Sequence, residues 1–116
     1  MSMNIQIYMV KRDFAVQKAE RFFKERRIAY QLVDLKKQRI GAREILLFAG
    51  KAGVRSLLNT SDPKVKEHPA CYASDENDVL QYLIDRPELM RLPIIRNGRE
   101  FTFGADESVW QRWIGK

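Results

Sequence analysis

The residues best suited to chemistry are Lys11, Arg12 and Asp13, which lie between two segments of different periodicity. Residues 4–9 alternate between apolar and polar side chains, which predicts a half-buried strand. In residues 14–27 the apolar side chains recur at the spacing of one helix face. A helix N-terminus in such a loop offers unpaired N–H groups and positive dipole charge, which suit an anion or a thiolate. The loop itself contains no cysteine, serine or glycine.

The only cysteine of the 116 residues is Cys71, which excludes an internal disulfide and favours a reducing cytoplasm. His68 stands three residues before it. One histidine and one cysteine are too few ligands for a metal, and no third group is placed to orient a base. We therefore expect no metal site and a partly buried, inert Cys71.

Composition indicates one globular domain spanning residues 1–116, with 45% hydrophobic residues and a net charge of +6. No segment is apolar enough to span a membrane, and we expect neither a secretion signal nor membrane association. The charge is uneven: residues 9–43 contain eleven basic and four acidic side chains, whereas residues 60–90 contain three and seven. Such asymmetry is typical of solvated helix faces and of surfaces that attract a charged partner.

Periodicity and turn signals predict the remaining elements in chain order. After the first strand and helix, we expect a second strand at residues 28–35 and a helix at 42–53 that stops at Gly50 and Gly53. Asp62 or Ser61 is expected to cap a turn that begins at Pro63, and Ser74 is expected to cap a helix that ends before Pro87. Residues 92–103 read as a hairpin around Asn97-Gly98, and a last helix covers residues 106–114.

This order predicts an α/β protein of the thioredoxin-like fold with a four-stranded mixed sheet. The chain runs through β-α-β, a helical insertion at about residues 36–90, a β-hairpin and a final helix. The first strand–helix–strand unit implies a parallel pair with a right-handed crossover. Pro93, directly before the third strand, stands at the cis-proline position of that fold.

Nearly the whole chain resembles the arsenate reductase/Spx (ArsC-like) family of thioredoxin-fold proteins. The residues that carry the resemblance are Tyr8, Gln17-Lys18-Ala19, Leu57-Leu58-Asn59-Thr60, the stretch from Arg86 to Pro93, and Phe103-Gly104. These motifs match the family in order and spacing.

The departures from the family pattern fall on the residues that carry its chemistry. Counted from Tyr8, the position of the nucleophilic cysteine is Asp13 and that of the second cysteine or serine is Val16. Two family arginines are replaced by Ser61 and Leu92. Thiol chemistry needs a thiolate, so the resemblance implies no catalytic residue at Asp13 and a redox-inactive protein. Asp13 is expected to serve as a helix N-cap or as a carboxylate that a partner recognises.

Three functions remain open. In the first, the chain is a catalytically degenerate binding or regulatory module, with a protein partner near Arg12 and an Spx-like contact to the transcription machinery. In the second, it is a glutathione-linked arsenate reductase-like enzyme or thiol oxidoreductase that uses Cys71 as a displaced thiol. Lys11, Arg12, Asp13, Arg91, Leu92 and Pro93 are the candidate anion-binding or partner-binding residues in either case. No cofactor is expected, except glutathione under the second reading. Weak nucleic-acid contact is a third option, although no stacking or zinc signature accompanies it.

Overall fold

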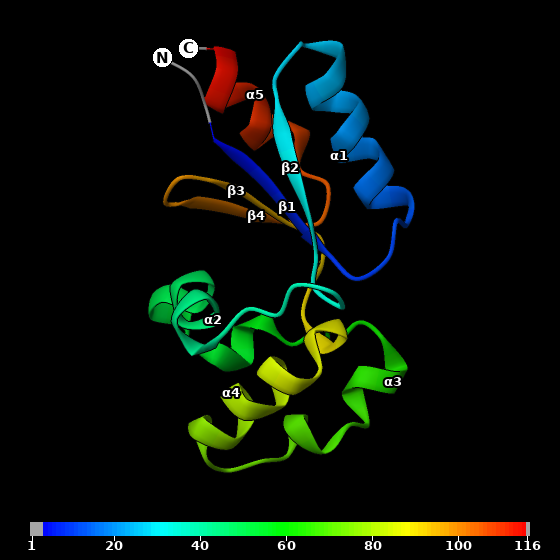
Figure 1. The fold of residues 1–116 in the computed structure, drawn as a ribbon. Helices are drawn as coiled ribbons and strands as arrows, with labels where there is room; N and C mark the ends of the chain where they lie inside the picture. Colours follow the sequence, from blue (N-terminus) through cyan, green and yellow to red (C-terminus); the bar gives the residue numbers. More distant parts are fainter. Residues whose placement is uncertain (1–3, 116) are drawn as a thin grey trace. The chain divides into compact units, whose positions relative to one another are not determined.

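The computed structural model describes residues 4–115, which divide into two compact units (Figure 1). The first unit combines the chain up to Asp34 with the chain from Leu92 onward. The second unit is the intervening segment, Leu35–Arg91. Each unit has its own set of buried apolar residues, and we describe them in turn.

The first unit is a four-stranded mixed sheet with two helices. Its strand order is β2-β1-β3-β4, with β1 parallel to β2 and antiparallel to β3, and β3 antiparallel to β4. This is the thioredoxin-like arrangement that the sequence predicted. The elements are β1 (Ile5–Met9), α1 (Phe14–Glu25), β2 (Tyr30–Asp34), β3 (Ile94–Asn97), β4 (Glu100–Phe103) and α5 (Glu107–Gly115).

Helices α1 and α5 cover the same face of this sheet. Alternate residues of β1 point toward them, and Ile7 lies opposite Ile95 of β3, so both contribute to one core. Trp110 of α5 is fully buried and its ring lies 5.2 Å from that of Phe22 and 5.4 Å from that of Phe23. Phe22, Phe23 and Trp110 are therefore core residues, as predicted, and the half-buried Trp113 packs against the same cluster.

Two tryptophan N–H groups attach α5 to β4. Trp110 Nε1 donates to Thr102 Oγ1 at 2.8 Å inside the core, and Trp113 Nε1 donates to Glu100 Oε1 at the same distance. The first of these bonds satisfies two polar groups that would otherwise be buried without a partner.

Several element boundaries differ from the sequence prediction. Helix α1 ends at Glu25, two residues early, because Arg27 adopts a left-handed conformation with φ 56°. The N–H of Ile28 donates to the Phe23 carbonyl at 2.9 Å, which is the Schellman arrangement that terminates a helix. Strand β2 consequently begins at Tyr30 rather than at Ile28.

The hairpin turn lies one residue later than predicted. Asn97 pairs with Glu100, so Gly98 and Arg99 form the two-residue loop, whereas Asn97-Gly98 was expected there. Of these two loop residues only Gly98 has a positive φ, 64°, which is the pattern of a turn with glycine at its first central position. The Leu92–Pro93 peptide bond is cis, as the fold led us to expect.

The second unit is helical. Its helices are α2 (Ala42–Ala49), α3 (Pro63–Lys66) and α4 (Glu76–Asp85), joined by short 3-10 turns. Helix α2 is shorter than the predicted 42–53: it ends at Ala49, and Gly50–Ala52 form a 3-10 turn. Asp62 caps α3 with Pro63 at its start, as predicted. Asp75, and not Ser74, caps α4, because its carboxylate accepts the N–H of Asn77 at 2.8 Å. Within residues 4–115, no helix is long and apolar enough to cross a membrane.

Candidate functional site

The candidate site lies at the junction of β1 and α1, where Asp13 is the N-cap of the helix. Asp13 Oδ1 accepts the N–H of Val16 at 3.0 Å, and the Asp13 carbonyl accepts the N–H of Gln17 at 3.0 Å. Asp13 has the extended backbone of an N-cap, with ψ −175°. The predicted N-cap is confirmed.

This cap determines what the helix N-terminus can bind. A negative charge is stabilised there by the free N–H groups and by the helix dipole, and the Asp13 carboxylate supplies that charge from within the chain. The side chain of Val16, three residues after Asp13, is fully buried among apolar residues and contributes no polar group to the junction. The junction therefore presents a fixed carboxylate and contains no nucleophilic sulfur.

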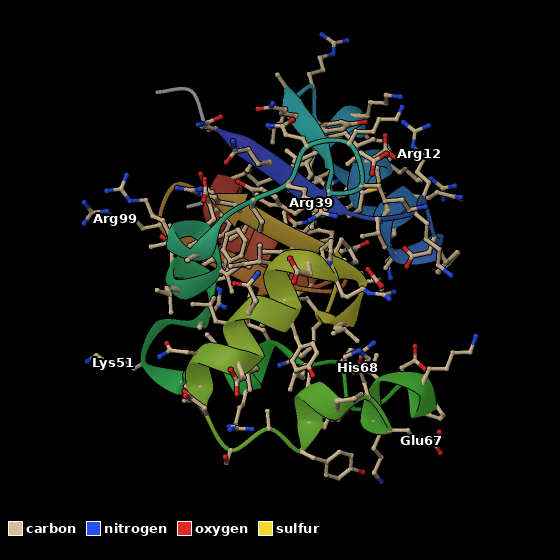
Figure 2. All side chains as sticks on the ribbon, turned by 60° about the horizontal axis from the view of Figure 1, so that its bottom comes forward. Arg12, Arg39, Lys51, Glu67, His68 and Arg99 are labelled. Atoms are coloured by element: carbon tan, nitrogen blue, oxygen red, sulfur yellow. The ribbon has the colours of Figure 1, made fainter. Side chains whose placement is uncertain are left out.

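Arg12 turns from the loop onto the side of α1, where it meets Glu20 (Figure 2 labels Arg12). Its guanidinium makes two hydrogen bonds to the Glu20 carboxylate, Nε to Oε2 at 2.8 Å and Nη2 to Oε1 at 3.1 Å. The hydroxyl of Tyr30 donates to Glu20 Oε1 at 2.7 Å. Glu20 is 9% exposed, and these donors compensate for the burial of its charge.

The same cluster changes the acidity of Tyr30. Burial raises the pKa of Tyr30 to about 12, the hydrogen bond to Glu20 and its negative charge act in the same direction, and the positive charge of Arg12 opposes them. Tyr30 consequently remains a neutral hydrogen-bond donor throughout the physiological pH range.

The other predicted site residues are distributed over both units. Lys11 is exposed in the β1–α1 loop. The Pro93 carbonyl accepts the N–H of Gly104 at 2.7 Å, within the first unit. Arg91 belongs to the second unit, where its N–H donates to the Leu57 carbonyl at 2.8 Å. Leu92 is half-buried beside the cis bond.

Cys71 also belongs to the second unit. It is partly buried, as predicted, and its thiol donates to the Val65 carbonyl at 3.1 Å. His68 Nδ1 accepts the N–H of Ala70 at 3.0 Å, and its ring contacts that of Tyr82 edge to face. The Nδ1 atom of His68 is thus already a hydrogen-bond acceptor for a backbone N–H. Among residues 4–115, no group of three or more histidine, cysteine or acidic residues could hold a metal ion.

The solvent face of α1 is basic and carries one large apolar side chain. We use the term α1 surface for Phe14, Gln17, Lys18 and Arg21, which recur at helical spacing. Phe14 is 80% exposed. All four residues line a hollow of about 210 Å³. This surface combines the ring of Phe14 in the first turn of α1 with two cations further along the helix. Glu25 and Glu107 also line the hollow, and Lys18 Nζ lies 3.9 Å from Glu107 Oε2.

Sequence reasoning missed the role of Glu20 and Tyr30. The available signal was the position of Glu20 on α1, four residues after Val16 and one after Ala19, both of which are buried. A carboxylate on the inner face of a helix needs a partner, and Arg12 at the preceding loop was the cation within reach.

The four-stranded mixed sheet, with α1 following β1 directly, places the chain among the small α/β proteins of thioredoxin-like fold. A profile of the ArsC family matches residues 8–113, and the chain belongs to that family. No match was found among curated protein sequences.

Solved structures support the fold at low sequence identity. The YffB protein has a TM-score of 0.80 at 17% identity, with 93% of this chain and 96% of that chain covered. An arsenate reductase related protein from Brucella melitensis has a TM-score of 0.72 at 19% identity, covering 100% and 98%. The arsenate reductase from Vibrio cholerae has a TM-score of 0.71 at 16% identity, covering 87% and 89%.

Proposed function

We propose that this chain is a redox-inactive member of the ArsC family that acts as a binding or regulatory module. The observation that carries the proposal is the hydrogen bond from the Val16 N–H to the Asp13 carboxylate. Through this bond the Asp13 carboxylate occupies the N-terminus of α1, and a carboxylate cannot carry out the thiolate's attack on an oxyanion or a disulfide.

The cations of the loop support the same conclusion. An arsenate or glutathione carboxylate bound at the junction would meet the negative charge of Asp13 at short range. Arg12 already binds Glu20 through one edge of its guanidinium, with Nε and Nη2 both donating to the carboxylate. Releasing it for an external anion would leave the buried Glu20 carboxylate with fewer donors, which is unfavourable.

The contact with a protein partner is proposed for the α1 surface. Phe14 supplies an exposed aromatic ring next to Lys18 and Arg21, and aromatic and arginine side chains are enriched at the centres of protein interfaces. A partner with an acidic patch and an apolar pocket fits this surface. An Spx-like contact to the transcription machinery is the specific form of this proposal.

The alternative is a glutathione-linked arsenate reductase-like enzyme or thiol oxidoreductase that uses Cys71. It has the similarity to the Vibrio cholerae arsenate reductase in its favour. Against it stands the environment of Cys71, which is partly buried and whose thiol already donates a hydrogen bond to the Val65 carbonyl.

Two experiments test the proposal. Thiol-transferase and arsenate reduction assays are expected to show no activity in the wild-type chain or in Cys71→Ala. Activity that disappears in Cys71→Ala would establish the alternative instead.

The binding role is tested separately with a photo-cross-linking residue at position 21, and at position 99 on the exposed hairpin loop as the matched control. We expect a specific protein adduct from position 21 at native salt, lost in Phe14→Ser and absent from position 99. No adduct, or the same adducts from both positions, would contradict the proposed role of α1.

A further inference from the structure

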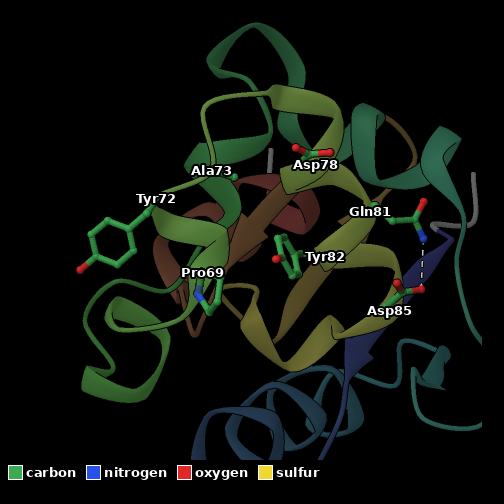
Figure 3. Close-up of a pocket in the computed structure, with 7 residues that line it drawn as sticks. All are labelled: Pro69, Tyr72, Ala73, Asp78, Gln81, Tyr82 and Asp85. Atoms are coloured by element: carbon green, nitrogen blue, oxygen red, sulfur yellow. Dashed lines mark hydrogen bonds between the residues drawn. The ribbon is translucent and has the colours of Figure 1, made fainter.

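The second unit contains a groove that the proposed function does not use. Its volume is about 560 Å³, and all of its lining belongs to the segments 69–73 and 78–85. Figure 3 shows the side chains of α4 that face it, with Tyr82 between Asp78 and Asp85 and the ring of Tyr72 extending outward from the rim. The lining residues are Pro69, Tyr72, Ala73, Asp78, Gln81, Tyr82 and Asp85.

Four of these residues form one face of α4. Asp78, Gln81, Tyr82 and Asp85 are spaced by three, one and three residues, so they lie along one side of the helix. The opposite side is buried through Val79 and Leu83. The groove face is therefore a helix face that contributes little to the core of its own unit.

The charge of the groove is opposite to that of the chain. Two carboxylates and no lysine or arginine line it, although the chain as a whole carries a net charge of +6. No described side chain pairs with the carboxylate of Asp78. Asp85 accepts from Gln81 Nε2 at 3.1 Å, and Arg39 Nη1 lies 3.9 Å from it. The position of Arg39 shows that a guanidinium can approach this rim.

Aromatic groups complete the chemistry of the groove. Tyr72 is 73% exposed, and the ring of Tyr82 lies between the two carboxylates along the helix. Tyrosine rings attract guanidinium groups and pack against proline. The α4 side of the groove therefore carries one tyrosine ring, edge to face with that of His68, between two carboxylates.

We propose that this groove binds a cationic, extended segment of a partner protein with arginines at positions i and i+3. Asp78 and Asp85 are separated by seven residues, which is about 10.5 Å along a helix axis. In a polyproline II segment, residues i and i+3 point the same way and lie about 9.3 Å apart. Two arginines at this spacing reach one carboxylate each, and the residues between them cover Tyr82.

The test uses a capped Gly-Arg-Pro-Pro-Arg-Gly peptide, titrated into the isotope-labelled full chain while amide chemical shifts are recorded. We expect saturable shifts along α4 and in residues 69–73. The same peptide with glutamate in place of arginine is expected to cause none. Absence of shifts with the arginine peptide, or equal shifts with both peptides, would overturn the proposal.

Matched variants separate the groove from general charge attraction. Asp78→Asn with Asp85→Asn should weaken binding by roughly tenfold or more, because two ion pairs are lost. Glu67, labelled in Figure 2, belongs to the same unit but is not a lining residue, so Glu67→Gln should leave affinity unchanged. Equal weakening by both changes would contradict a specific site.

Tyr82→Phe should keep most of the affinity and Tyr82→Leu should lose it, because the ring rather than the hydroxyl makes the contact. Equal affinity of Tyr82→Leu and the wild type would remove the aromatic part of the proposal. Concentration-dependent shifts on α4 without peptide, together with the mass of a dimer, would assign the groove to a second copy and overturn a partner segment.

Discussion

The guanidinium of Arg12 and the carboxylate of Glu20 form a bidentate ion pair, with N–O distances of 2.8 and 3.1 Å. It joins the loop that carries Asp13 to the side of the helix that Asp13 caps. Because Glu20 is largely buried and Arg12 is exposed, the pair anchors a surface loop to an interior carboxylate. This relationship explains why Arg12 is a structural residue of the junction.

Replacement of Arg12 by alanine should lower the free energy of unfolding by about 1 kcal/mol, since Glu20 retains Tyr30 but loses two charged donors. Urea denaturation monitored by circular dichroism measures this change. Lys11→Ala is the matched control, because Lys11 is a neighbouring exposed cation, and its effect should stay below about 0.5 kcal/mol. Equal effects of the two substitutions would show that the ion pair contributes nothing.

Tyr30 should make stability depend on pH in the alkaline range. Its pKa rises from 10.0 to about 12 on folding, mainly through burial and then through Glu20. The folded state therefore retains the phenol proton more strongly than the unfolded state. The stabilisation is fully present below pH 10 and is lost as pH rises toward 12.

Tyrosinate absorbance should show one tyrosine that titrates late, and this step should disappear in Tyr30→Phe. In Glu20→Gln it should move to lower pH, because the negative charge that opposes ionisation is removed. A late step that is unchanged in both variants would contradict the cluster.

The left-handed conformation of Arg27 gives a stabilising substitution. Its φ of 56° costs a residue with a Cβ about 1 kcal/mol, which glycine avoids. Arg27→Gly should raise the melting temperature, whereas Arg27→Ala should not, because alanine retains the steric cost. A stabilisation that is equal for both would assign the effect to the removed charge.

The sequence was sufficient for the fold because its local signals agree with one another. The alternation in β1, the helical spacing of Phe22 and Phe23, and the proline before β3 all point to the same arrangement. Asp13 could be assigned as the N-cap because its position immediately precedes a periodic apolar segment.

Three features could not be predicted from the local sequence pattern: the end of α1, the position of the hairpin loop and the contact between Glu20 and Tyr30. The end of α1 is set by the left-handed residue Arg27, where no glycine marks the helix C-terminus. The hairpin loop is shifted because cross-strand pairing of Asn97 with Glu100 decides the register. Glu20 and Tyr30 meet only after α1 and β2 fold together, so their hydrogen bond leaves no contiguous motif in the sequence.

The Asp13 carboxylate occupies the N-terminus of α1, so we expect no thiol or oxyanion chemistry there. Titration of the isotope-labelled chain with glutathione, arsenate and sulfate, read by amide chemical shifts, tests it most directly. We expect no shifts at residues 11–15 or at Leu92-Pro93 at millimolar ligand, in the wild type and in Cys71→Ala. Saturable shifts at those residues would show that an anion or thiol site is open beside Asp13.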